Sequence, residues 1–171
     1  MNSGLAHQLD LFARRLAPFG FTLMLVLFEA VPVPVPDFLP AMPALSFISI
    51  YYWTVHRPDL LPPVAVFFIG LLLDVVTGTL MGANALVLLL IWGLIVSQRR
   101  FLLEWAAHIV WAAFIFNVVL WGGLLWALQS AFSGVALGVG PLAGQLLLTV
   151  LLYPPVVWVL SRTRRGLREA E

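Results

Sequence analysis

The sequence contains no cysteine and no lysine, and only 10% of its 171 residues are charged. Without cysteine the chain has no disulfide, no thiolate nucleophile and no thiolate-bound metal. The nine basic residues are all arginine and are nearly balanced by eight acids, which gives a formal net charge of +1. A basic surface for nucleic acid is therefore not expected, and no nucleic-acid-binding motif is present.

Catalytic motifs are also missing from the sequence. It has no Ser-His-Asp order, no glycine-rich phosphate loop and no His-Glu-x-x-His zinc motif. Glu104 and His108 stand four residues apart and could pair across one helical turn, but a metal site needs three or four protein ligands. We expect this pair to be structural, and we expect neither an enzyme nor a cofactor or metal site.

Hydrophobic residues are abundant, at 62% of the chain, and the mean hydropathy is +1.02. Soluble domains are nearer 45–50% apolar. A helix needs roughly 20 apolar residues to cross about 30 Å of hydrocarbon. Dividing the chain at its charges and prolines predicts an all-α, polytopic membrane protein of one domain, with short polar tails and six transmembrane helices at about 16–31, 41–56, 62–80, 83–97, 103–130 and 141–160. The pair Pro154-Pro155 predicts a kink in the last helix.

The arginines predict the orientation of these helices, because cytoplasmic loops and flanks carry an excess of positive charge. The connections predicted on the opposite side, at about 31–40, 77–83 and 130–140, contain no arginine. With six spans, all nine arginines fall on one side of the membrane: Arg14, Arg15, Arg57, Arg99, Arg100, Arg162, Arg164, Arg165 and Arg168. Both termini are therefore predicted to be cytoplasmic.

The third predicted helix carries a stripe of small residues, in which Gly70, Asp74, Gly78 and Gly82 recur every four positions. Residues at that spacing lie on one face of a helix. Small residues on such a face allow a second helix to approach closely within the membrane. We interpret these four residues as a helix-packing or partner interface.

Asp74 has three possible roles. An acidic side chain within the membrane costs about 2.5–3.5 kcal/mol even on the milder scale, so it must face protein or water. It could relay protons or cations, with Glu29 and Asn117 as the available polar partners. It could instead accept hydrogen bonds from backbone amides near Thr77, or contact a partner protein near the outer surface.

Beside the Gly70–Gly82 stripe, the sequence contains Tyr52-Trp53, His56-Arg57-Pro58, prolines that open the third helix and Asn84-Ala85-Leu86. Together these features resemble the bacterial rod shape-determining protein MreD family. The resemblance covers about residues 51–90. It implies a non-enzymatic scaffold subunit of the cell-elongation complex in the bacterial inner membrane, which helps to organise peptidoglycan synthesis and cell shape.

The partners that the resemblance implies are MreC first, and then RodA, a class B penicillin-binding transpeptidase and MreB. The fold it implies is similar to the substrate-binding subunits of energy-coupling-factor transporters. The alternative function is therefore a small-molecule, vitamin-like binding subunit of a transporter, although the sequence offers little polar material for a pocket.

Two loops complete the candidate interface. The cytoplasmic loop with Arg57, Pro58 and Asp59 is a candidate for packing or for cytoplasmic contact, and it could equally serve only as a topology signal and helix stop. The outer loop is rich in proline, which restricts its backbone. We expect it to offer partners a rigid surface at Pro32, Pro34, Pro36 and Asp37.

Overall fold

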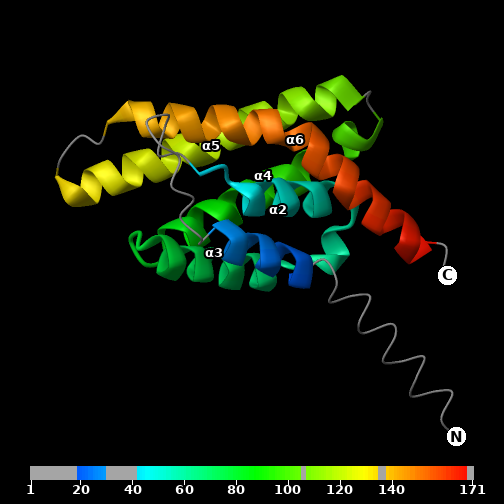
Figure 1. Cartoon of the computed structure of the whole chain (residues 1–171), viewed down its shortest axis with the longest axis horizontal. Helices are drawn as coiled ribbons and strands as arrows, with labels where there is room; N and C mark the ends of the chain where they lie inside the picture. The colour runs from blue at the N-terminus through cyan, green and yellow to red at the C-terminus, as the bar shows by residue number, and fades with distance from the viewer. Residues whose placement is uncertain (1–18, 30–41, 105–106, 135–137, 169–171) are drawn as a thin grey trace, which may run out of the picture.

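The computed structural model describes residues 19–29, 42–104, 107–134 and 138–168, and these residues form helices without any strand (Figure 1). The prediction of an all-α fold is therefore confirmed. The Phe19–Glu29 helix, drawn in blue, comes first. It is followed by α2 (Leu45–His56), the short 3₁₀ helix η1 (Pro58–Leu60), α3 (Pro63–Thr77), α4 (Ala83–Glu104), α5 (Ala107–Ser133) and α6 (Val139–Arg168).

Three of these helices are long and apolar enough to cross a membrane. The apolar stretches are Ala83–Leu102 in α4, His108–Ser133 in α5 and Val139–Arg162 in α6. The 12 residues of α2 and the 15 of α3 extend only about 18 and 22 Å at 1.5 Å per residue. The chain is thus a membrane protein, and the other three predicted spans form shorter helices in the residues that the structure describes.

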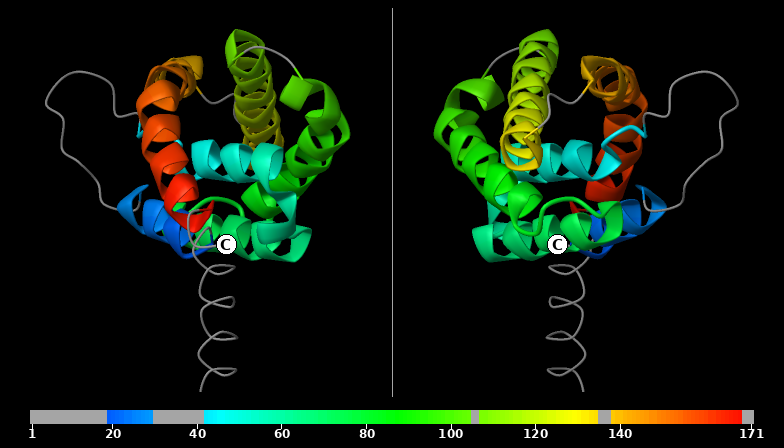
Figure 2. Two further views of the ribbon diagram at one scale, coloured as in Figure 1. Left: turned by 90° about the vertical axis from the view of Figure 1, so that its right-hand side faces the viewer. Right: turned by 90° about the vertical axis from the view of Figure 1, so that its left-hand side faces the viewer.

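The short helix α2 lies at the centre of the bundle, enclosed by longer helices in both views of Figure 2. Ten of its twelve residues are buried. Its aromatic side chains pack against those of α5 and α6: the ring of Tyr51 lies 5.1 Å from that of Phe114 and 6.1 Å from that of Tyr153. Because α2 is surrounded by protein, it does not need the length of a membrane span.

The first turn of α2 is capped by side chains from other helices. A helix leaves its first amides without partners inside the helix, and apolar surroundings offer them no water. The backbone N–H of Ala44 donates to Oγ1 of Thr149 in α6 at 2.9 Å. The N–H of Ser46 donates to Oε2 of Glu29 at 3.4 Å. These contacts tie the start of α2 to two neighbouring helices.

Two helix ends differ from the prediction. Helix α4 continues through Arg99 and Arg100 to Glu104, because no proline or glycine interrupts it there and arginine is a good helix former. Glu104 is therefore the last residue of α4 while His108 lies in α5, and the pairing of their side chains stays a prediction. Helix α6 continues through Pro154-Pro155 to Arg168. It changes direction in its second half (Figure 1), as a proline-induced kink requires.

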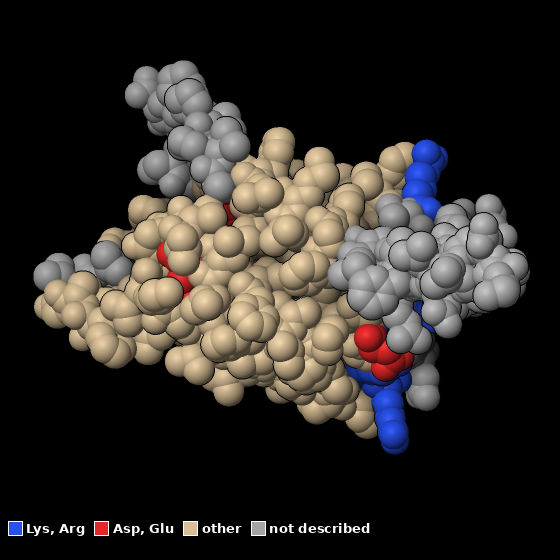
Figure 3. Space-filling view, turned by 90° about the horizontal axis from the view of Figure 1, so that it is seen from below, with Lys and Arg blue, Asp and Glu red and all other residues tan. Residues whose placement is uncertain are grey.

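The described arginine side chains gather at one end of the molecule (Figure 3). This end holds the loop after α2 and the C-terminal parts of α4 and α6. The Phe19–Glu29 helix begins, and α6 ends, on this side (Figure 1). The opposite end carries Glu29 and Asp74 and is called the Asp74 end below. That the arginine end faces the cytoplasm stays a prediction from the positive-inside rule.

Candidate functional site

The turn between α3 and α4 shows what two of the four stripe residues do. Helix α3 ends at Thr77, and Gly78 caps it in the left-handed conformation with a φ of 65°. Gly82 lies further along the turn with a φ of 94°. Positive φ is strained for residues with a Cβ, so both glycines are needed by the turn. The prediction that all four residues share one helix face is therefore wrong for Gly78 and Gly82.

Gly70 lies on α3 where it crosses α4. A Cβ added at this position would lie 2.5 Å from Cα of Ala85 and 2.8 Å from its backbone nitrogen. The close approach that a small residue permits in a membrane protein is thus used inside the chain, between α3 and α4.

Asp74 is 1% exposed and accepts hydrogen bonds from the start of α4. Its Oδ1 accepts from the backbone N–H of Asn84 at 2.9 Å and from Nδ2 of the same residue at 3.0 Å. The hydroxyl of Thr79 also donates to Oδ1, at 3.0 Å. The backbone N–H of Gly82 donates to Oδ2 at 2.8 Å.

These four hydrogen bonds explain how an acidic side chain can be buried here. A negative charge is favourable at a helix N-terminus, where free amides and the helix dipole meet it. Burying a charge without such partners would be very costly. Of the three roles considered for Asp74, the geometry matches an acceptor for backbone amides. The two residues considered as relay partners bond elsewhere: Glu29 to Ser46, and Asn117 to the carbonyl of Ala113.

The two predicted loops differ in what the structure describes. In the loop after α2, the backbone N–H of Arg57 bonds the carbonyl of Trp53 at 2.7 Å, and Pro58 starts η1. Pro58 is buried, while Arg57 and Asp59 are exposed. The outer-loop residues Pro32, Pro34, Pro36 and Asp37 lie outside the described residues.

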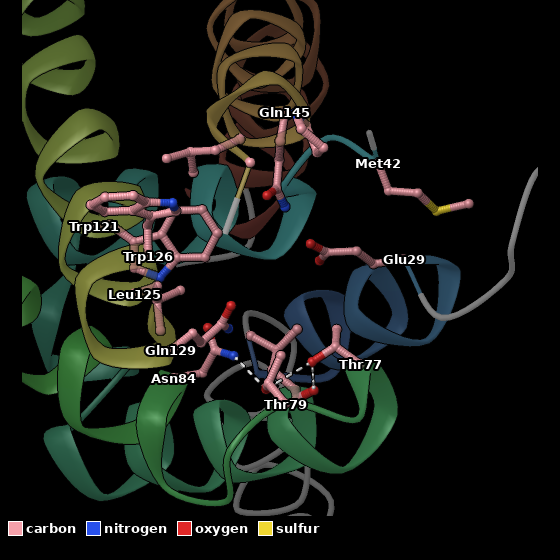
Figure 4. Close-up of a pocket in the computed structure, with 15 residues that line it drawn as sticks. Glu29, Met42, Thr77, Thr79, Asn84, Trp121, Leu125, Trp126, Gln129 and Gln145 are labelled. Atoms are coloured by element: carbon pink, nitrogen blue, oxygen red, sulfur yellow. Dashed lines mark hydrogen bonds between the residues drawn. The ribbon is translucent and has the colours of Figure 1, made fainter. Parts of the chain in front are cut away.

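A cavity of about 590 Å³ lies beside the Asp74 network (Figure 4). Its walls come from the Phe19–Glu29 helix, the α3–α4 turn, α5 and α6. The polar and indole side chains that line it are Glu29, Thr77, Thr79, Asn84, Trp121, Trp126, Gln129 and Gln145. Two of these, Thr79 and Asn84, are bonded directly to Asp74, so the buried carboxylate also holds one wall of the cavity.

Sequence reasoning did not find the polar side of this cavity. Gln129 in α5 and Gln145 in α6 are part of no motif and are separated by a loop. The available signal was that both are polar residues in apolar helices near the same end of the bundle. The expectation of little polar material for a pocket is therefore corrected. Among the described residues, no group of three histidine, aspartate or glutamate side chains could hold a metal ion.

Comparison with known protein families gives a match over most of the chain. The family of the rod shape-determining protein MreD matches residues 12–162 of the chain. No curated protein and no solved structure matches it, so the expected similarity to energy-coupling-factor subunits stays a prediction.

Proposed function

The chain belongs to the MreD family of rod shape-determining proteins, and we propose that it serves rod shape as a non-enzymatic scaffold subunit in the bacterial inner membrane. In this proposal it binds MreC directly. RodA, a class B penicillin-binding transpeptidase and MreB are further members of the complex. The role of the chain is to hold these proteins in an arrangement that organises peptidoglycan synthesis.

The observation that carries the proposal is the fixed geometry of the α3–α4 unit. Asp74 bonds the start of α4, and Gly70 lets the two helices touch. A surface held in this way loses little conformational entropy when a partner binds. Because Gly70 and Asp74 are used internally, we propose that the partner contacts the outer side of the unit instead.

The outer side of α3 presents a row of exposed apolar side chains. Val64, Phe68 and Val75 are 63%, 58% and 64% exposed. Their spacing of four and seven residues places them on one helix face. Gly78 caps α3 three residues after Val75, and a Cβ added at Gly78 or at Gly82 in the following turn would meet no atom within 4 Å. We propose that the spanning helix of MreC lies along this row. The absence of side chains at Gly78 and Gly82 in the α3–α4 turn would let that helix approach closely.

The test uses two double variants with matched chemistry. The first, Phe68→Ala with Val75→Ala, trims the proposed interface on α3. The second, Leu147→Ala with Leu151→Ala, trims side chains of α6 that are 61% and 62% exposed. Each variant is co-expressed with MreC, and the amount of MreC that co-purifies is measured together with cell shape.

We expect the α3 variant to lose most of its MreC and to give rounded cells, while the α6 variant behaves as wild type. Equal retention of MreC by both variants, with normal rods, would show that the α3 row only faces lipid.

A further inference from the structure

The cavity at the Asp74 end has the size of a ligand site. Small-molecule pockets are commonly about 300–1,000 Å³ and combine apolar walls with a few polar groups. This cavity, of about 590 Å³, has such a lining: leucine, methionine and proline side chains lie beside the polar and indole groups.

The charge of the residues that line the cavity indicates whether an anionic or a cationic ligand can bind there. Glu29 is the one ionisable group among the described residues that line the cavity. Figure 4 shows its carboxylate directed into the cavity from the Phe19–Glu29 helix. The described arginines lie at the opposite end of the bundle. Glu29 would therefore repel an anionic ligand, and no described arginine lies nearby to offset this repulsion. A cationic ligand would be attracted.

The indole side chains that line the cavity also favour a cationic ligand. Trp121 and Trp126 of α5 lie across the cavity from Glu29 (Figure 4). Indole faces attract ammonium groups, and quaternary ammonium ligands are commonly recognised in this way. The indole N–H of Trp121 is also buried without an acceptor among the described residues, which is uncommon for a buried donor. A ligand that carries an acceptor oxygen near its ammonium group would meet both needs.

We propose that this cavity binds a small ligand with an ammonium group, which pairs with Glu29 and packs against the indoles of Trp121 and Trp126. Gln129 and Gln145 supply neutral hydrogen-bonding groups for the remainder of the ligand. This chemistry has two possible sources, a free amine outside the membrane and the headgroup of phosphatidylethanolamine. The inference is separate from the binding of MreC, because its residues lie inside the bundle rather than on the outer side of α3.

The experiment measures binding by the purified full-length protein. Thermal unfolding is followed during titration with ethanolamine and choline, and with sodium phosphate as an anionic control. A second arm uses native mass spectrometry after exchange into mixed micelles of phosphatidylethanolamine and phosphatidylglycerol, and it scores which lipid is retained. The two arms separate a free amine from a lipid headgroup.

The decisive variant is Glu29→Gln, whose amide oxygen can still accept from Ser46 and so retain the cap of α2. Asp59→Asn, at the opposite end, removes one acid far from the cavity. Trp126→Leu tests the indole wall independently.

We expect ethanolamine or choline to stabilise the wild-type protein and Asp59→Asn, or phosphatidylethanolamine to be retained by both. Glu29→Gln should weaken the interaction at least roughly tenfold, as expected for loss of a charged hydrogen bond. Trp126→Leu should weaken it less. The proposal is overturned if neither amine nor phosphatidylethanolamine binds, if phosphate stabilises the protein better, or if Glu29→Gln binds as well as the wild type.

Discussion

Asp74 and Asn84 are joined twice, because Oδ1 of Asp74 accepts from both the backbone N–H and the side-chain amide of Asn84, at 2.9 and 3.0 Å. One residue lies near the end of α3 and the other at the start of α4. The pair therefore ties two consecutive helices together at one end of the bundle. The same pair supports the cavity, since Asn84 is part of its wall.

Replacing Asp74 with leucine should destabilise the protein by about 2–4 kcal/mol, because the buried donors of Asn84 and the part-buried donors of Gly82 and Thr79 lose their acceptor. Asp74→Asn should have a smaller effect, since an amide oxygen can still accept at one position. The measurement is the free energy of unfolding in detergent. Asp59→Leu, at an exposed position, is the control and should change it by no more than about 0.5 kcal/mol. Equal stability of Asp74→Leu and wild type would refute the capping role.

Gly70→Ala should destabilise the packing of α3 on α4 by about 1–3 kcal/mol. The reason is that the new methyl group would meet the backbone of Ala85, which cannot turn aside as a flexible side chain can. Gly93→Ala is the matched control, because an added Cβ there meets no atom within 4 Å. It should be neutral or stabilise α4 by up to about 1 kcal/mol through helix propensity. If Gly70→Ala and Gly93→Ala have the same free energy of unfolding, α3 and α4 do not approach each other as described.

Thr149→Val should weaken the start of α2 by about 1–2 kcal/mol, because valine fills the same space but leaves the N–H of Ala44 without its acceptor. Hydrogen exchange at the Ala44 amide should become faster, while the middle of α2 stays protected. Ser161→Ala serves as the control, since that hydroxyl bonds only the carbonyl of Trp158 within its own helix among the contacts described. Unchanged exchange at Ala44 in Thr149→Val would contradict the cap across helices.

The order and approximate positions of the helices were predictable from apolar runs and prolines, but arginine and proline did not end α4 and α6, which continue through Arg99-Arg100 and Pro154-Pro155. Pro62-Pro63 marked the start of α3, and the arginines marked one end of the bundle. Which helix lies at the centre of the bundle was less predictable. The local sequence of α2 does not show that protein surrounds it, because burial depends on helices distant in the chain.

The candidate site was likewise predictable from the sequence only in part. A four-residue spacing of glycines is compatible with a helix face and with a tight turn, and only the backbone conformation of Gly78 and Gly82 distinguishes them. Asp74 was identified from its cost in the membrane, but its donors come from a turn whose path the sequence does not specify. Gln129 and Gln145 line one cavity only because α5 and α6 pack beside each other.

The measurement that tests the central claim most directly is co-purification of MreC with the wild-type chain from native membranes, with stoichiometry determined by mass spectrometry. The scaffold account predicts a stable complex that contains MreC in a fixed ratio to this chain. A folded, membrane-inserted protein that is recovered without MreC would contradict the account.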